Sequence, residues 1–134
     1  MVKIAFLLKR KAGLTHRQFR EYYESNHAPL ARRLLPLFQH YSRFFIVQDD
    51  GYIPPHMQAQ NMQFDVITHI TFETQADYEK HLEMLKDPAL AAELSADEEK
   101  FIDRDASVFF LVEQEKTPDD ILDEERKAFA DKVG

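Results

Sequence analysis

Three of the four predicted strands in this sequence carry large apolar side chains on both faces, and this feature limits the possible folds most strongly. Residues 2–9, 39–48 and 105–113 each place apolar residues at consecutive positions, and consecutive side chains of a strand point to opposite sides. The fourth strand, 63–72, has one apolar row and one mixed row. A sheet built from these strands therefore needs apolar cover on both faces.

Helices between the strands are predicted from their N-terminal signals. Thr15 and Gln18 have the spacing of a capping box, in which each side chain bonds the free backbone N–H of the other residue. Pro29 disfavours the helical conformation at Ala28, so this helix is expected to end near residue 26 or 27. Similar signals predict further helices at about 29–35, at 74–86, from 87 onward and at 117–131, with a long loop at 49–62.

The resulting order, β-α-β-β-α-β, predicts an α+β, ferredoxin-like fold in which a four-stranded antiparallel sheet carries its helices on one face. Aromatic side chains left on the other face would cost roughly 25 cal/mol for each Å² exposed to water. A two-fold partner that lays its own sheet on this face removes that cost. We therefore expect a homodimer, a dimeric α+β barrel whose interior lies between the two sheets. The expected domain is 1–113, followed by an extra, charged C-terminal helix in the tail 114–134.

Composition excludes several classes of protein. The net charge is −7 and the pI is about 5.3, whereas a nucleic-acid-binding protein usually presents a basic face. No window approaches the ~20 apolar residues of a membrane span. The chain has no cysteine, which excludes disulfides and thiolate nucleophiles and is typical of a cytoplasmic protein.

Motifs for bound cofactors and metals are missing from the sequence. With three glycines, the chain has neither a P-loop nor a dinucleotide-binding fingerprint. His40, His56 and His81 share no spacing typical of metal ligands, and His81 is expected at the surface. We therefore expect neither a metal nor an organic cofactor.

Asp65 and His69 are the first candidates for catalysis. They lie four residues apart on the strand 63–72, so both would face the barrel interior, about 13 Å from each other. A carboxylate and an imidazole in an apolar cavity are natural acid–base groups, because burial and neighbouring charges shift their pKa values. The structural alternative is that His69 bonds a neighbouring strand and Asp65 caps a loop.

His27 and Asp97 are further candidates. His27 lies one turn past Tyr23 at the expected end of a helix, where the helix dipole favours a cation, and a capping role is the alternative. Asp97 falls on the apolar stripe that contains Leu94 and Phe101, an unusual place for a carboxylate. Its alternative is a structural role in the first turn of a helix that starts after residue 95.

Six segments of the sequence together have a recognisable order and spacing: 9–15, 19–23, 27–30, 64–65 with 72, 87–88 and 97–104. In this order they resemble the EthD-domain proteins, over about residues 2–113. The resemblance implies a dimeric α+β barrel. It also implies kinship with fungal polyketide decarboxylases, cyclase-like polyketide enzymes and a methylmuconolactone isomerase, which act on small cyclic or phenolic acids, generally without metal or organic cofactor.

The resemblance also assigns expected roles to residues. The family histidine before Ala-Pro corresponds to His27 and is implicated in catalysis in some members. The family aspartate on the third strand corresponds to Asp65. Many members carry glutamate four residues later, where this chain has His69, and this departure leaves the reaction open.

The sequence therefore predicts a cofactor-independent enzyme that acts on a small aromatic or polyketide-like substrate by proton transfer. Decarboxylation, dehydration, cyclisation and isomerisation are the expected reaction types. His27 or His69 would move the proton and Asp65 would orient or polarise the substrate. The alternatives are a non-catalytic binding or protective module for a hydrophobic small molecule and a haem protein with a histidine ligand. The residues expected to hold the substrate ring are Tyr23, Tyr41, Phe45 and Phe109.

Overall fold

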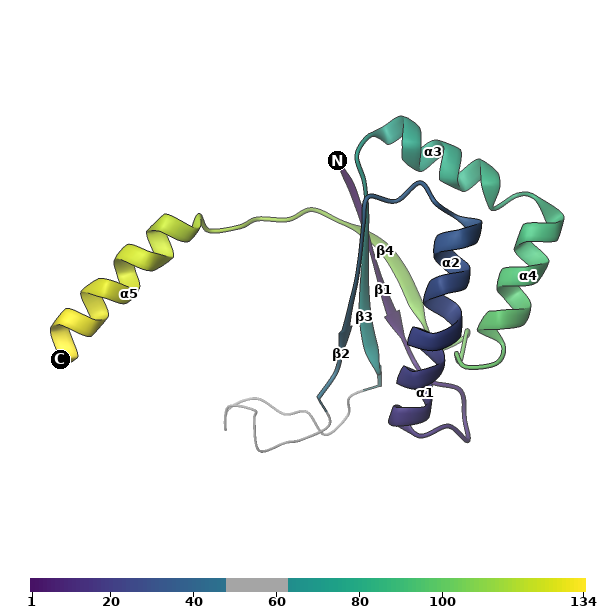
Figure 1. Cartoon of the computed structure of the whole chain (residues 1–134), viewed down its shortest axis with the longest axis horizontal. Coiled ribbons are helices and arrows are strands. Elements are labelled where there is room, and N and C mark those ends of the chain that lie inside the picture. Colours follow the sequence, from purple (N-terminus) through teal and green to yellow (C-terminus); the bar gives the residue numbers. More distant parts are fainter. Residues whose placement is uncertain (48–62) are drawn as a thin grey trace.

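The computed structural model describes residues 1–47 and 63–134, so the loop expected at 49–62 lies outside the described residues. Its four strands are β1 (Val2–Leu8), β2 (His40–Phe45), β3 (Val66–Phe72) and β4 (Val108–Val112). They form one sheet in the order β2-β3-β1-β4, and every neighbouring pair is antiparallel (Figure 1). The α+β, ferredoxin-like fold predicted from the element order is confirmed.

The register decides which side chains share a face of the sheet. Ile4 pairs with Ile70, and Phe6 pairs with both Thr68 and Phe109. This row faces the helices. The alternate row contains Ala5, His69 and Phe110, which are also register partners. It faces away from the helices.

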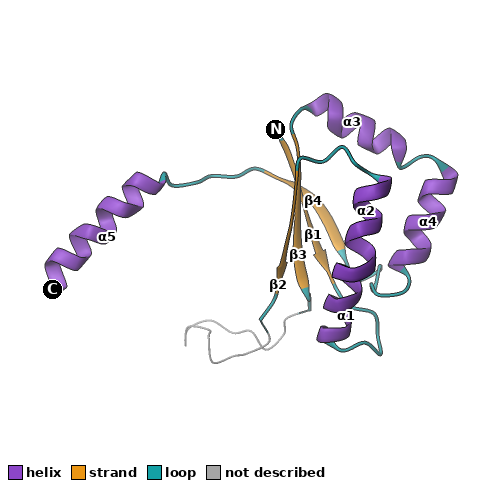
Figure 2. Ribbon diagram, viewed as in Figure 1, coloured by secondary structure: helices purple, strands orange, loops and turns teal. Residues whose placement is uncertain are grey.

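The helices that cover the first row lie on one side of the sheet, and the other side is open (Figure 2). Their starts follow the predicted signals. The capping box of Thr15 and Gln18 is present with both reciprocal bonds. The side chains of Thr74 and Asp87 cap α3 and α4 by accepting backbone N–H bonds. These covering elements are α1 (His16–Tyr22), the π-helical turn η1 (Tyr23–His27), α2 (Ala28–Leu34), α3 (Gln75–Met84) and α4 (Pro88–Glu98).

The prediction that the first helix ends near residue 26 or 27, before Pro29, is wrong. Ala28 has helical dihedral angles, φ −62° and ψ −44°, and its N–H bonds the carbonyl of Tyr23, five residues back. The wider π-helical turn absorbs the proline, whose missing N–H falls in the first turn of α2. As a result α1, η1 and α2 continue into one another, and His27 projects from the middle of this rod.

Two apolar clusters form the core between helices and sheet. The first centres on Phe19, Tyr23 and Phe101 and includes Leu8. The second combines Phe72 with apolar neighbours from β1, β3 and α3. Side chains of both clusters line one cavity, which the next section describes.

The open face of the sheet and the C-terminal helix both carry exposed apolar side chains. Phe44, Val108 and Phe110 are 52%, 44% and 40% exposed. The predicted C-terminal helix is present as α5 (Asp119–Val133), which stands away from the domain at the end of an extended segment (Figure 1). The predicted domain boundary at residue 113 stays a prediction. Among the described residues, no helix has both the length and the apolar character needed to cross a membrane.

Candidate functional site

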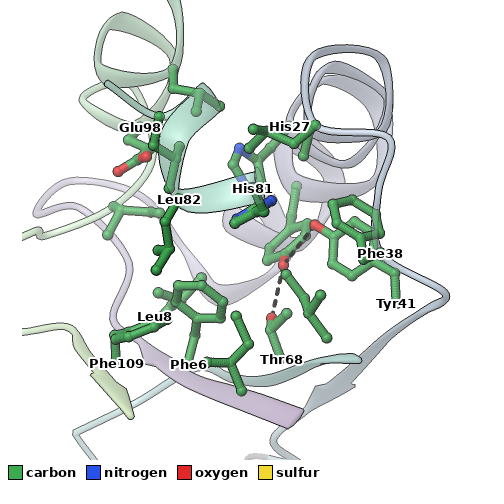
Figure 3. Close-up of a pocket in the computed structure, with 18 of the residues that line it drawn as sticks. Phe6, Leu8, His27, Phe38, Tyr41, Thr68, His81, Leu82, Glu98 and Phe109 are labelled. Atoms are coloured by element: carbon green, nitrogen blue, oxygen red, sulfur yellow. Dashed lines mark hydrogen bonds between the residues drawn. The ribbon is translucent and has the colours of Figure 1, made fainter. Parts of the chain in front are cut away.

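A cavity of about 250 Å³ lies between the helix-facing row of the sheet and the covering helices (Figure 3). Most of its wall is apolar. A small set of polar side chains interrupts the wall, and such an arrangement is typical of small-molecule sites. The polar residues that line it are Tyr23, His27, Tyr41, Thr68, Tyr78, His81 and Glu98.

His27 forms a buried pair with Asp97. Its Nδ1 lies 2.6 Å from Asp97 Oδ2, and the two side chains are 13% and 9% exposed. The hydroxyl of Tyr22 donates to Asp97 Oδ1 at 2.7 Å. Because an ionised carboxylate only accepts hydrogen bonds, Nδ1 of His27 carries the proton of this bond. The lone pair on Nε2 is thereby left for a molecule in the cavity.

The local fold explains why this pair forms. The π-helical turn places His27 edge-on to Tyr23 and against Phe101, with ring centroids 5.0 and 4.9 Å apart. Asp97 reaches it from the last turn of α4. Burial, together with the hydrogen bond to Asp97 and the charge of Asp97, raises the pKa of Tyr22 to about 12. Tyr22 therefore stays a neutral donor that fixes the carboxylate.

Glu98 is the acidic side chain in the cavity wall. Burial raises its pKa above the ordinary range, and the positive charges of Arg104 and of His27 in its protonated form partly oppose this effect. Its Oε2 lies 3.9 Å from Nε of Arg104. Glu98 can therefore take up a proton more readily than an exposed glutamate.

Three hydroxyl groups form a second polar element of the wall. Tyr41 donates to the Tyr23 hydroxyl at 3.0 Å, and Tyr23 lies 2.7 Å from Thr68 Oγ1, as the dashed lines in Figure 3 show. Burial raises the pKa of both tyrosines, so both are neutral near pH 7. Arg43 lies over the Tyr41 ring at 4.7 Å and is held by two bonds to Glu24.

His81 is a second imidazole in the wall, and the prediction that it lies at the surface is wrong. It is 6% exposed and packs on Phe72, with ring centroids 4.8 Å apart. Burial lowers its pKa, so the ring is neutral near pH 7. The sequence did hold a signal for this position, because Tyr78, His81 and Leu85 have the spacing of one helical face.

The prediction that Asp65 shares a pocket with His69 is wrong. Asp65 precedes β3 at a bend, where its Oδ2 accepts the backbone N–H of Arg10 at 2.9 Å. Its Oδ1 lies 3.0 Å from Arg10 Nη1 and 2.8 Å from His16 Nδ1. The residue is therefore engaged by the segment between β1 and α1 and is not part of the cavity wall, which fits the structural alternative of loop capping.

The other predicted site residues divide between the two faces of the sheet. His69 lies on the open face, beside Phe44 at 5.2 Å, and does not meet His27. Phe45 packs in the core against Phe19 and Tyr23 rather than along the cavity. Tyr23, Tyr41 and Phe109 do line the cavity, and their role in binding stays a prediction. Within the described part of the chain, no three His, Asp or Glu side chains come together as potential metal ligands.

The family model of the EthD domain matches residues 11–105, more than half of the chain. The chain belongs to the EthD domain family. The resemblance seen in the sequence segments is thereby confirmed. Among curated protein sequences, none matches this EthD-domain chain significantly.

Solved structures with the same fold include proteins of a plant and of bacteria. A protein from Arabidopsis thaliana is 14% identical with a TM-score of 0.58, and the alignment covers 88% of this chain and 99% of that one. An EthD family protein from Bacillus halodurans is 16% identical with a TM-score of 0.57, covering 86% and 100%. HapK from Hahella chejuensis is 12% identical with a TM-score of 0.53, covering 88% and 96%. At these identities the likeness concerns the fold alone.

Proposed function

We propose that this EthD-domain protein is a cofactor-independent enzyme that moves a proton within a small aromatic or polyketide-like molecule bound in the cavity. The observation that carries the proposal is the 2.6 Å bond between His27 Nδ1 and Asp97 in a mostly apolar wall, where Nε2 has no bond to another described residue. An imidazole oriented in this way by a carboxylate is the usual arrangement of a general base.

In the proposed mechanism, Nε2 of His27 removes a proton from an acidic C–H or O–H group of the substrate. Asp97 holds the Nδ1–H and stabilises the imidazolium that forms. The same Nε2–H then returns the proton to another atom of the substrate, so that no oxidant or reductant is needed. Tyr22 keeps Asp97 in place through its bond to Oδ1.

The hydroxyl groups of Tyr23 and Tyr41 support the same chemistry. When a C–H group next to a carbonyl loses its proton, negative charge moves to the carbonyl oxygen. Both tyrosines lie in the wall and stay protonated because burial raises their pKa. A neutral O–H placed near that oxygen stabilises the charge as it develops.

Deuterium exchange tests the proposal without knowledge of the natural substrate. The protein is incubated in D2O with a panel of 1,3-diketones and hydroxylated aromatic ketones, and deuterium incorporation is followed by NMR. We expect exchange above background with at least one compound and its loss in His27→Gln. Equal exchange in the variant, or none with any compound, contradicts a base role for His27.

The largely apolar wall also suits a non-catalytic binding module for a hydrophobic small molecule. Such a module would bind members of the same panel without exchanging their protons. The same experiment, combined with a binding titration, therefore separates the two functions.

We also propose that the protein is a homodimer joined through the open face of the sheet. This face exposes the side chains of Phe44, Val108 and Phe110 to water, which costs a monomer free energy that a partner subunit would remove. Light scattering at micromolar concentration is expected to give twice the chain mass of 15.8 kDa. Phe110→Lys is expected to shift the population to monomer, and a monomeric wild-type protein contradicts the proposal.

A further inference from the structure

We propose that the cavity selects an uncharged ring compound with two hydrogen-bonding oxygens, one for His27 and one for His81, and that it rejects carboxylates. The inference rests on the proposed function for the use of the same cavity. It goes further because it names the class of ligand and gives the second imidazole a role. Four observations support it: the place of His81 in the cavity wall, the different elements that carry the two imidazoles, the charges around the cavity and its volume.

The side chain of His81 can bond a ligand through one ring nitrogen. The residue is more than nine-tenths buried and lines the cavity. Its Nδ1 is enclosed without a partner among the described residues, so the nitrogen left for a ligand is Nε2. A buried N–H without an acceptor is rarer than an acceptor without a donor, so we place the proton on Nε2. His81 then offers a hydrogen-bond donor to a ligand oxygen.

The two imidazoles reach the cavity from different elements and rest on different parts of the core. His27 packs on Phe101, in the cluster that includes Leu8 at the end of β1. His81 packs on Phe72, whose strand partner is Val2 at the start of β1. Figure 1 shows α3 over the starting end of β1, with the junction of α1 and α2 further along the strand. A single ligand therefore needs two polar groups to form a hydrogen bond with each imidazole.

The charges around the cavity disfavour an anion. Within the described part of the chain, no lysine or arginine lines the wall. Arg43, behind Tyr41, already makes two bonds to Glu24. Glu98 adds an acidic side chain to the wall. A carboxylate that entered would lose its hydration without gaining a cationic partner, which is costly in an apolar site.

The volume sets the size of the ligand. An engineered apolar cavity of about 150 Å³ binds benzene. The cavity here is about 250 Å³, enough for one substituted ring. The inferred class is thus a neutral phenol, enone or cyclic ketone with a second oxygen across the ring. Among the proposed reactions, this favours isomerisation, cyclisation or dehydration over decarboxylation of a free acid.

Equilibrium binding of three matched probes tests the inference. The full chain is titrated at pH 7 with 4-hydroxyacetophenone, 4-hydroxybenzoate and acetophenone, and the affinities are measured by NMR. We expect 4-hydroxyacetophenone to bind at least about 10-fold more tightly than 4-hydroxybenzoate and about 5-fold more tightly than acetophenone, the size of one lost hydrogen bond. Binding requires no turnover, so a failure of the proposed catalysis leaves this result intact.

His81→Phe isolates the second imidazole, since phenylalanine keeps a ring and removes the hydrogen bond. The variant is expected to bind 4-hydroxyacetophenone and acetophenone each about 5-fold more weakly, because both carry a carbonyl that accepts from His81, while the matched control His69→Phe on the open face keeps the wild-type affinities. In the wild-type protein, the ring 15N signals of His81 are expected to shift with both compounds. This measurement needs no variant to fold.

Three results overturn the inference. The first is equal or tighter binding of 4-hydroxybenzoate, which would mean that the cavity accepts anions. The second is no detectable binding of any probe. The third is an unchanged affinity of both ketones in His81→Phe or unmoved His81 signals, which would mean that His81 does not contact the ligand.

Discussion

Two histidine–aspartate pairs in this protein have nearly the same bond and different surroundings. His27 Nδ1 lies 2.6 Å from Asp97, and His16 Nδ1 lies 2.8 Å from Asp65. All four groups are at least half buried, with Asp97 and Asp65 side chains 9% and 6% exposed. The bond alone therefore does not identify an acid–base site.

The difference lies in what else each aspartate binds. Asp65 also accepts the backbone N–H and the guanidinium of Arg10, so its charge is balanced and it ties the β1–α1 segment to the start of β3. Asp97 is bonded by the neutral hydroxyl of Tyr22, and its histidine lines a cavity. A free imidazole nitrogen facing a cavity therefore marks the candidate base, whereas an added cation marks a structural pair.

The largest expected effect separates the two histidines. His27→Gln is expected to lower turnover by about 100-fold to 10,000-fold, about 3–5 kcal/mol in activation free energy, because the general base is lost. His16→Gln, the matched control, is expected to change turnover by a few-fold at most. Steady-state kinetics on the substrate found by deuterium exchange measure both, and equal losses in the two variants would mean that the two pairs do not differ in function.

The second prediction concerns the structural pair. Asp65→Ala is expected to lower the free energy of unfolding by about 2–3 kcal/mol, because buried hydrogen bonds to Arg10 and His16 are lost. Urea unfolding measures the change. Turnover of the folded fraction is expected to stay near the wild-type value, and a large loss of turnover at unchanged stability would place Asp65 in the chemistry after all.

The third prediction concerns the carboxylate of the candidate base. Asp97→Asn is expected to lower turnover by about 10-fold to 100-fold, because an asparagine can hold the imidazole without stabilising its positive charge. As a positioning residue, Asp97 should also change the pH profile of turnover. If turnover falls and the pH profile keeps its wild-type shape, the effect is structural and the contrast with Asp65 weakens.

The smallest expected effect concerns His81, a buried histidine without a carboxylate partner. Burial lowers its pKa from 6.5, so below that pH the unfolded chain takes up a proton that the folded chain resists. The free energy of unfolding therefore falls as the pH drops below 6.5. His81→Phe is expected to show a shallower fall than the wild-type protein in unfolding curves between pH 5 and 7, and an identical slope contradicts this assignment.

Much of the fold follows from signals that act over a few residues. The capping box of Thr15 and Gln18 and the caps at Thr74 and Asp87 were predicted because each bond joins residues three apart. The short apolar runs predicted the strands, and with the helix starts they predicted the order of the elements along the chain, in the same local way. The break at Pro29 was wrong because a local preference was overridden, since the packed π-helical turn keeps Ala28 helical.

The candidate site combines local and long-range features. The ferredoxin-like order, the helix starts and the candidacy of His27 could be predicted, since they depend on near neighbours and on a motif. The partners could not, because His27 pairs with Asp97, 70 residues away, and Asp65 pairs with His16, 49 residues away. The inward turn of His81 to the cavity likewise appears only in the folded chain. Each of these contacts depends on how helices rotate against the sheet as the core packs, and no spacing along the chain encodes that rotation.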